Sequence, residues 1–353
     1  MALPILICDD SKLARKQMAR SLPPGWDVEI SYATNGQEGV EMIRQGKGDV
    51  VFLDLNMPVM DGYQVLETVQ KNDLPALIIV VSGDIQPEAY TRVKQLGALD
   101  FIKKPTNKAK IGEILVAYGI VESQQLLELE NDLAALAHMA PLKQDTLSPK
   151  IVDYRDHYQE IANVAMGRAA DLLARLLDVF IVLPIPNVNI LETSELHMAL
   201  SSVEENESMS AVCQGFIGSG IAGEALLLFH DSSFEDMSKL MKYQGQLDDN
   251  GQLEVLMDIA NILIGACLKG VSDQLDVGFS QGHPVVLGQH CNISDLINNN
   301  THRWQKTLAI EINYTIEKHN IQCDLLLLIT EDSMPTLNNK ISYLFEHYEP
   351  TSK

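Results

Sequence analysis

The sequence has 353 residues, which is enough for two domains of about 150 residues each. It is 46% hydrophobic and 21% charged, so it can bury a sizeable core and is neither a disordered nor a fibrous chain. The formal net charge of −22 repels nucleic-acid phosphates and anionic lipid, so we expect no nucleic-acid partner and no membrane-surface partner.

The negative charge is concentrated in one part of the sequence. Residues 1–120 hold 15 acidic and 13 basic residues, whereas the rest of the chain holds 33 acidic and 13 basic residues. Two domains of different origin explain this difference. We expect a first domain over residues 1–120, a helical connector over 121–150 and a second domain over 151–353.

The cysteines and the N-terminus indicate a cytoplasmic protein. The five cysteines are scattered and form no C-x-x-C pair, as is typical of reduced thiols. The first residues have no signal-peptide pattern, and no apolar run approaches the ~18 residues that a membrane helix needs.

Short apolar runs alternate with helical stretches along residues 1–120. The runs are rich in β-formers and mostly continuous, which is typical of parallel strands buried on both faces. Strands separated by helices predict a doubly wound α/β domain with a parallel five-stranded sheet. The five predicted strands are Pro4–Cys8, Asp27–Tyr32, Val50–Leu53, Ala76–Val81 and Asp100–Ile102.

Polar residues follow four of these strands, at the edge where such sheets bind ligands. They are Asp9 and Asp10 after the first strand, Asp54 after the third, Ser82 after the fourth and Lys104 after the fifth. Three carboxylates at one edge repel each other unless a cation lies between them, and their hard oxygens suit Mg2+. Lys104 and the Ser82 hydroxyl would then contact phosphoryl oxygens on Asp54. The pattern predicts phosphoryl transfer to a carboxylate.

Each element alone has a simpler interpretation. Asp9-Asp10 is compatible with a helix N-cap, Lys104-Pro105 with a strand end, and Asp54 with an isolated loop acid. Their occurrence together, in order and at the right strand ends, favours the phosphoacceptor site.

The sequence around these residues resembles the response-regulator receiver domain of the CheY type. The matching segments are Ile7–Ser11, Leu53–Gly62, Val81–Gly83 and Phe101–Pro105. The resemblance implies a flavodoxin-like fold, phosphorylation of Asp54 by a histidine kinase, and Mg2+ held by Asp9, Asp10 and Asp54. It also implies a switch formed by Ser82, Phe101 and Lys104. Phe101 has no hydroxyl to donate inward, so we expect a modified switch.

The connector carries a short heptad pattern. Leu126, Leu129, Leu133 and Leu136 follow spacings of three, four and three residues, the a/d pattern of about two heptads. These leucines either pack on one of the two domains or form a helix that joins a homodimer, and two heptads leave both interpretations open.

The second domain contains an internal repeat. Four residues recur 98 positions later in the same order: Asp156, Glu160, Asn163 and Pro186 correspond to Glu254, Asp258, Asn261 and Pro284. The first three of each set follow spacings of four and three, which place them on one face of a helix. We expect a pseudo-twofold, duplicated α/β domain with repeats at about 151–245 and 250–350. Each repeat has a long helix, several strands and a closing helix, at Phe234–Tyr243 and Met334–Phe345.

An acid and a carboxamide on one helix face suit the hydrolysis of a phosphoryl group. The asparagine amide both donates and accepts hydrogen bonds without charge, so it can orient a water molecule without repelling an anion. The acid can pair with a cation on a partner and fix the distance to the phosphate. A single asparagine on an amphipathic helix is usually just exposed or capping, but two copies in matched register favour a function.

These residues at these spacings resemble the CheC/CheX/FliY family of receiver phosphatases. The resemblance implies that Glu160 engages the phosphate-site lysine of a phosphorylated receiver and that Asn163 orients the attacking water. Asp258 and Asn261 would form a second site, whose activity is open because Asp258 is one methylene shorter than glutamate. Asp156, Pro186, Glu254 and Pro284 would be supporting positions.

The sequence therefore predicts a chemotaxis-type two-component response regulator whose output domain is an aspartyl-phosphate phosphatase, a hydrolase. Its expected substrate is a phosphorylated receiver of the CheY type, with attack in cis on Asp54 as a second activity. The alternative is a phosphorylation-gated adaptor that binds a receiver or motor component without hydrolysis. The phosphatase interpretation requires Glu160 and Asn163 to lie on an exposed helix surface with room for a docked partner.

Overall fold

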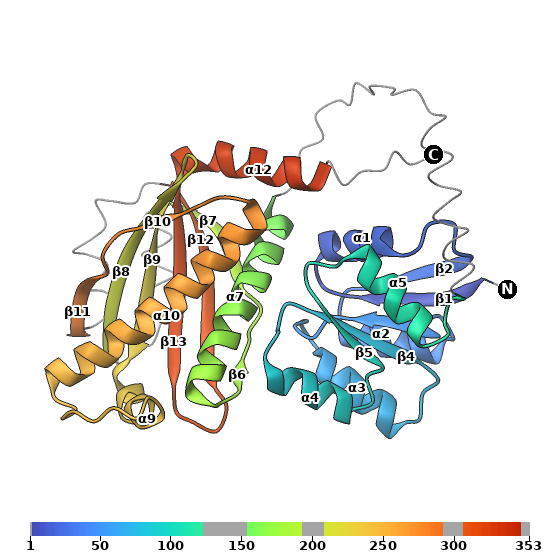
Figure 1. The fold of residues 1–353 in the computed structure, drawn as a ribbon, viewed down its shortest axis with the longest axis horizontal. Helices are drawn as coiled ribbons and strands as arrows, with labels where there is room; N and C mark the ends of the chain where they lie inside the picture. The colour runs from blue at the N-terminus through green and yellow to red at the C-terminus, as the bar shows by residue number, and fades with distance from the viewer. Residues whose placement is uncertain (1, 123–153, 193–207, 292–305, 347–353) are drawn as a thin grey trace. The chain divides into compact units, whose positions relative to one another are not determined.

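A computed structural model describes residues 2–122, 154–192, 208–291 and 306–346. The chain divides into two compact units, Met1–Asp156 and His157–Lys353 (Figure 1). The leucines of the predicted connector helix, Leu126, Leu129, Leu133 and Leu136, lie outside the described residues.

The first unit is a parallel five-stranded sheet covered by helices on both faces. Its strands follow the order β2-β1-β3-β4-β5, and every neighbouring pair is parallel. The strands are β1 (Leu3–Cys8), β2 (Val28–Ala33), β3 (Val50–Leu53), β4 (Leu77–Ser82) and β5 (Asp100–Lys103). The helices are α1 (Lys12–Ser21), α2 (Gly36–Arg44), α3 (Gly62–Lys71), α4 (Pro87–Gln95) and α5 (Lys108–Ala117). The predicted doubly wound parallel sheet is confirmed, and each strand end lies within one residue of its predicted position.

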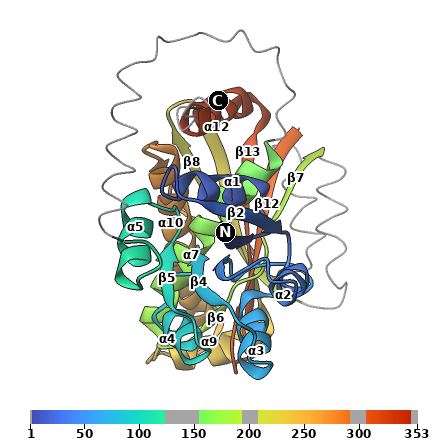
Figure 2. The same cartoon turned by 90° about the vertical axis from the view of Figure 1, so that its right-hand side faces the viewer.

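Two hydrophobic clusters hold this unit together, one on each face of the sheet. Val40 of α2 and Val65 of α3 belong to the cluster on one face. Met18 of α1 and Ile111 of α5 belong to the cluster on the other face. Figure 2 shows α2 and α5 on opposite sides of the strands. Burial on both faces is why the strand sequences are continuous apolar runs.

Side-chain caps start the helices a few residues after the strands end. Ser11 accepts a hydrogen bond from the Ala14 amide at the start of α1, and Asn35 accepts one from the Glu38 amide at the start of α2. Asp61 and Gln64 form a reciprocal capping box at the start of α3. The caps therefore fix where the loops at the carboxyl edge of the sheet end, and with them the side chains that these loops carry.

The second unit is built on an antiparallel eight-stranded sheet. Its strands are β6 (Ile181–Val182), β7 (Asn187–Glu192), β8 (Met209–Gly218), β9 (Ile221–His230), β10 (Ser280–Gln281), β11 (Val285–Cys291), β12 (Lys306–Ile316) and β13 (Gln322–Thr330). Its helices are α7 (Arg155–Leu177), which begins at the junction of the units, α9 (Phe234–Leu240), α10 (Asp249–Leu275) and α12 (Met334–Glu346). The 3-10 turns η1 (Asp231–Ser233) and η3 (Glu331–Ser333) precede α9 and α12. The predicted closing helices thus occur as α9, three residues shorter than expected, and as α12.

The order of elements in this unit occurs twice. A long helix, a two-residue strand, three longer strands, a 3-10 turn and a closing helix run from α7 to α9 and again from α10 to α12. The sheet order is β10-β8-β9-β13-β12-β6, with β11 also paired to β8 and β7 also paired to β12. Pro186 directly precedes β7 and Pro284 directly precedes β11, at the start of a strand where proline is tolerated.

The two long helices cross in close contact on one face of the sheet (Figure 1). A Cβ atom added at Gly270 of α10 would lie 2.7 Å from the Cα atom of Ala165 on α7. The Gln274 amide donates to the backbone carbonyl of Ile161, and Arg168 forms a 2.6 Å ion pair with Asp273. This crossing fixes which residues of α7 and α10 face away from the sheet.

Helix α10 has the length and hydropathy of a membrane span, which the sequence analysis did not anticipate. It has 27 residues, and its most apolar window has a mean hydropathy of 1.6. However, 56% of that window is buried inside the fold, and α10 packs against β8 and β9. A core helix of a folded domain has this composition, and α10 is one.

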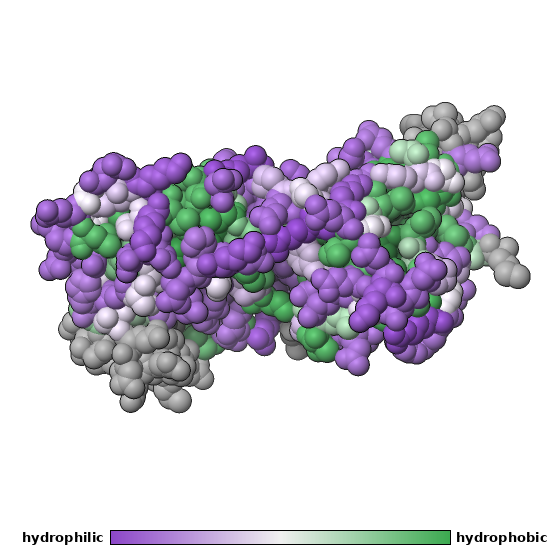
Figure 3. Space-filling view, turned by 90° about the horizontal axis from the view of Figure 1, so that it is seen from below, coloured by the Kyte–Doolittle hydropathy of each residue, from purple (hydrophilic) through white to green (hydrophobic). Residues whose placement is uncertain are grey.

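The opposite face of the sheet is also apolar. Met209 and Ala211 of β8, Leu226 and Leu228 of β9, and Leu328 of β13 belong to a buried cluster there. On the surface, Figure 3 shows mostly hydrophilic residues with smaller hydrophobic areas between them. All five cysteines are free, and burial raises the pKa of the Cys267 thiol to about 12.

Candidate functional site

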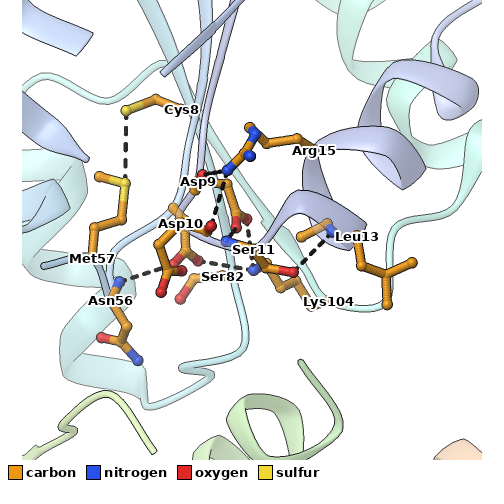
Figure 4. A network of polar contacts seen from close by, with 12 residues as sticks. Cys8, Asp9, Asp10, Ser11, Leu13, Arg15, Asn56, Met57, Ser82 and Lys104 are labelled. Carbon is orange, nitrogen blue, oxygen red and sulfur yellow. Dashed lines mark hydrogen bonds and ion pairs between the residues drawn. The ribbon is translucent and has the colours of Figure 1, made fainter. Parts of the chain in front are cut away.

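The carboxyl edge of the parallel sheet brings the predicted phosphoacceptor residues together. Asp9 and Asp10 follow β1, and Asp54 follows β3. One carboxylate oxygen of each lies within 4.8 Å of the other two, so the three acids form one cluster, which we call the acid pocket. Figure 4 shows Asp9 and Asp10 side by side in it. Adjacent β1 and β3 place them there, because the Asp54 amide donates to the Cys8 carbonyl at 2.9 Å.

Lys104 enters this pocket from the end of β5. Its ammonium lies 2.8 Å from Oδ2 of Asp9 and 3.3 Å from Oδ1 of Asp54, and all three side chains are almost fully buried. The Lys104 amide donates to the Ser82 carbonyl at 2.9 Å, which joins the loop after β5 to the end of β4. The strand ends therefore bring the Lys104 ammonium together with the acids, as predicted.

The acid pocket carries more negative charge than Lys104 neutralises. Burial, followed by the nearby carboxylates of Asp54 and Asp9, raises the pKa of Asp10 to about 7. A divalent cation held by oxygens from these acids would remove that repulsion. Mg2+ takes oxygen ligands, uses few carboxylates and keeps several waters. The donor set therefore fits the predicted Mg2+, with Asp9, Asp10 and Asp54 as the residues that would hold it.

The other predicted switch residues, Ser82 and Phe101, differ in their burial and in their contacts. The Ser82 hydroxyl is fully buried and accepts a hydrogen bond from the Asp84 amide at 3.1 Å. Phe101 is half-buried on β5, and its ring packs edge-on against Tyr90 of α4 with 6.0 Å between centroids. This aromatic contact joins β5 to α4. The Phe101 ring has no hydroxyl, so it takes part in the contact without donating a hydrogen bond.

The loop that follows Asp54 is braced by close backbone approaches. The Gly62 amide donates to the Leu55 carbonyl at 2.9 Å, and a Cβ atom at Gly62 would lie 2.3 Å from the Asp54 carbonyl oxygen. The Asn56 amide donates to Oδ2 of Asp54 at 3.1 Å. Glycine is required at position 62 because the phosphoacceptor backbone leaves no room for a side chain.

Arg15 is a residue of this site that the sequence analysis missed. It lies on α1, and its Nη1 atom donates to the backbone carbonyls of Asp9 at 2.6 Å and Asp10 at 2.9 Å (Figure 4). The available signal was a basic residue one turn into the helix that follows the paired acids.

Glu160 and Asn163 lie one turn apart on α7, as their spacing predicted. They are 6% and 4% exposed in the whole chain, and the expectation that a docked partner reaches this pair stays a prediction. Among the described residues, the Oδ1 atom of Asn163 has no hydrogen-bond partner. Asp156, in the first turn of α7, is half-buried.

The corresponding residues of α10 are accessible. Glu254, Asp258 and Asn261 are all exposed and lie on one face of the helix. The Tyr243 hydroxyl donates to Oε2 of Glu254 at 2.8 Å, which orients that carboxylate. The second predicted site is therefore open to solvent.

Comparisons with known proteins give a family match within the first unit. Residues 5–116 match the response regulator receiver domain family. Protein-glutamate methylesterase/protein-glutamine glutaminase 3 of Geobacter sulfurreducens is 34% identical over 165 residues, which cover 46% of this chain and 40% of that protein. The chain thus spans about two fifths of the length of this curated relative.

Two solved structures are also similar. A chain of the CheX-CheY-BeF3-Mg complex of Borrelia burgdorferi is 28% identical, with a TM-score of 0.30, over 33% of this chain and 89% of that one. FliY of Thermotoga maritima is 18% identical, with a TM-score of 0.39, over 58% of this chain and all of that one. Together with the acid pocket and the parallel sheet, the family match shows that residues 5–116 are a two-component response regulator receiver domain.

Proposed function

We propose that this protein is a response regulator, phosphorylated on Asp54, whose second unit hydrolyses aspartyl phosphate on a receiver. The observation that carries the proposal is the pairing of an acid and an asparagine at the same spacing on two helices, beside a receiver domain. A histidine kinase would be the phosphodonor, in the cytoplasm.

The geometry of the acid pocket supports phosphorylation of Asp54. An Asp54 carboxylate oxygen attacks the phosphorus of a phosphohistidine, the phosphorus–nitrogen bond breaks, and the imidazole leaves with a proton from solvent. Lys104 already lies 3.3 Å from Oδ1 of Asp54 and would bind a phosphoryl oxygen there. When bound, Mg2+ would supply positive charge to the transferred group.

The repeated order of elements supports a gene-duplicated output domain. The two halves place α7 and α10, β8 and β12, and α9 and α12 at matching positions in the chain. The sheet is symmetric about the β9–β13 pair. On one side β8 follows β9 and pairs with β10 and β11, and on the other side β12 follows β13 and pairs with β6 and β7. A duplicated fold explains why both acid–amide pairs start on a long helix and are followed by a proline at a strand start.

Hydrolysis needs a water molecule placed in line with the acyl phosphate. The Asn163 or Asn261 amide would hold that water while its oxygen attacks phosphorus. The bond from phosphorus to the carboxylate oxygen then breaks, and orthophosphate and a free carboxylate are released. Glu160 or Asp258 would pair with the lysine of the bound receiver and set the distance. No strong base is required because the acyl phosphate is already labile.

The acid–amide pair of α10 lies at the surface of the second unit. Asp258 and Asn261 are exposed on α10 and are open to a receiver that arrives from solution. We therefore assign trans hydrolysis to the α10 pair. The α7 pair matches the family pattern at every position, and attack in cis on Asp54 is a second proposed activity.

The methylesterase and glutaminase activity in the names of the curated relatives is less well supported for the second unit. Ser210, Asp231 and His290 are linked there, but the Ser210 hydroxyl donates to Asp231 at 2.8 Å rather than to His290. Ser210 is also fully buried. A serine nucleophile needs an adjacent general base and access to substrate, so this arrangement is not a hydrolytic triad.

The test is loss of label from a phosphorylated CheY-type receiver mixed with the full chain. We expect acceleration over spontaneous decay, a large loss of that acceleration in Asn261→Ala, and complete loss in the Asn163→Ala/Asn261→Ala double variant. Asn250→Ala, an exposed residue of the first turns of α10, is the matched control.

Equal decay with the wild type, the double variant and buffer would exclude the phosphatase. If the receiver still bound the protein under those conditions, the phosphorylation-gated adaptor would be the correct function. A homodimer joined through residues 121–150 remains a separate proposal, which sedimentation of the full chain would test.

A further inference from the structure

Arg15 connects helix α1 to the backbone of the paired acids. Its Nη1 atom donates to the carbonyl oxygens of both Asp9 and Asp10, at 2.6 Å and 2.9 Å. The side chain is half-buried and comes from the second turn of α1, so it reaches back across the loop that follows β1 (Figure 4). It contacts the main chain of the acids, whereas Lys104 contacts carboxylates of the same pocket.

Two successive carbonyls on one nitrogen define the shape of this loop. In an extended chain neighbouring carbonyls point in opposite directions, so their convergence fixes a bend at Asp9–Asp10. The Ser11 amide donates to Oδ1 of Asp9 at 2.8 Å, and the Ser11 hydroxyl accepts from the Ala14 amide at 3.1 Å. The end of β1, the bend and the start of α1 are therefore linked by hydrogen bonds, and Arg15 supplies the two that have a charged donor.

The bend decides where the Asp9 and Asp10 carboxylates point. Both must converge with Asp54, although three like charges within 4.8 Å repel each other. A loop free to move would relieve that repulsion by turning one carboxylate toward solvent. A guanidinium suits the restraint because it is always charged and offers several donors in a fixed plane.

We propose that Arg15 is a positioning residue of the acid pocket, which holds the Asp9–Asp10 backbone so that both carboxylates converge with Asp54 on a divalent cation. The proposal rests on the proposed function only in taking that cation to be the Mg2+ of the phosphorylation site. Arg15 acts through the orientation of the loop and contacts neither the phosphoryl group nor the cation.

The matched variants are Arg15→Gln, Arg15→Lys and Lys16→Gln in the full chain. Lys16 is the next residue of α1 and is exposed, so its replacement removes the same charge without touching either carbonyl. Arg15→Lys keeps the charge but offers a single nitrogen in place of the planar fork.

The first measurement needs no metal. Hydrogen–deuterium exchange of the segment Asp9–Leu13 in EDTA reports whether the loop is held. We expect faster exchange in Arg15→Gln, an intermediate rate in Arg15→Lys and the wild-type rate in Lys16→Gln. The urea midpoint of the first unit should be the same in Arg15→Gln as in Lys16→Gln.

The second measurement is the affinity for Mg2+ alone, by calorimetry. Loss of a residue that orients metal ligands from outside typically weakens binding by about 10–100-fold, and we expect a loss in the lower part of that range for Arg15→Gln. Arg15→Lys should recover part of it. Identical exchange and identical affinity in Arg15→Gln and Lys16→Gln would overturn the positioning role while leaving the proposed function intact. If the wild type bound no Mg2+, the proposed phosphorylation chemistry would fail, and the exchange data would still decide the role of Arg15.

Discussion

Replacing Lys104 with methionine should strongly destabilise the receiver unit in the absence of metal. The substitution keeps an unbranched side chain of similar length and removes the ammonium that lies 2.8 Å from Asp9 and 3.3 Å from Asp54. Both carboxylates are almost fully buried, so solvent cannot replace the lost cation.

The size of the effect follows from these distances. At an effective dielectric constant of about 20, the attractions are about 6 and about 5 kcal/mol. Desolvation of the ammonium and of the two carboxylates offsets much of this, and removal of one partner of a buried pair typically costs about 3–5 kcal/mol. With a urea m-value of about 2 kcal/mol/M, the midpoint should fall by about 1.5–2.5 M.

The assay is urea unfolding at pH 8 in EDTA, followed by the fluorescence of Trp26. Trp304 is the second tryptophan of the sequence, so a Trp304→Phe background assigns the signal to the first unit. Adding Asp9→Asn to Lys104→Met should restore part of the stability, because a neutral amide needs no counter-ion. A midpoint shift below about 0.3 M would refute the reasoning that Lys104 compensates the buried acids.

Three further outcomes are expected. The pKa of Asp10 is raised to about 7, so metal-free stability should fall as pH rises from about 4 to about 7 and then level off; Asp10→Asn should flatten this profile in urea titrations. Gly62→Ala, whose Cβ would meet the Asp54 carbonyl, should cost about 1–3 kcal/mol and slow phosphorylation by a small phosphodonor, whereas Gly265→Ala, with nothing within 4 Å, should be neutral or stabilising. Asp258→Glu should increase the hydrolysis that depends on Asn261 in the labelled-receiver assay, and an unchanged rate would argue against an acid-to-lysine contact at α10.

The receiver fold was predictable because each buried strand, together with the polar residue that follows it, is a local pattern in the sequence. Parallel strands buried on two faces are apolar runs, and their carboxyl ends must meet, so Asp9, Asp54 and Lys104 were assigned to one pocket. Strand ends differed by one residue because small side chains such as Ala33 and Ser82 are compatible with either a strand or a loop. Arg15 was missed because a contact with backbone carbonyls leaves no mark in the pattern of side chains.

In the second unit the helices could be predicted from the sequence, but which helix faces are exposed could not. The spacing of four and three correctly placed Glu160 and Asn163 on one helix and Asp258 and Asn261 on another. The same spacing cannot tell which helix face is covered in the folded chain, since exposure depends on residues distant in sequence. The apolar composition of α10 was likewise ambiguous until its packing on β8 and β9 was known.

The pairing of β9 with β13 has a consequence for how this protein folds. Residues 223–229 of β9 pair with residues 323–329 of β13, so the centre of the sheet joins segments about 100 residues apart. Contacts of such high sequence separation slow folding, and they cannot form on the ribosome until the whole chain has emerged. A chain that stopped before α10 would present the apolar edge of β9 to other molecules and would be prone to aggregate.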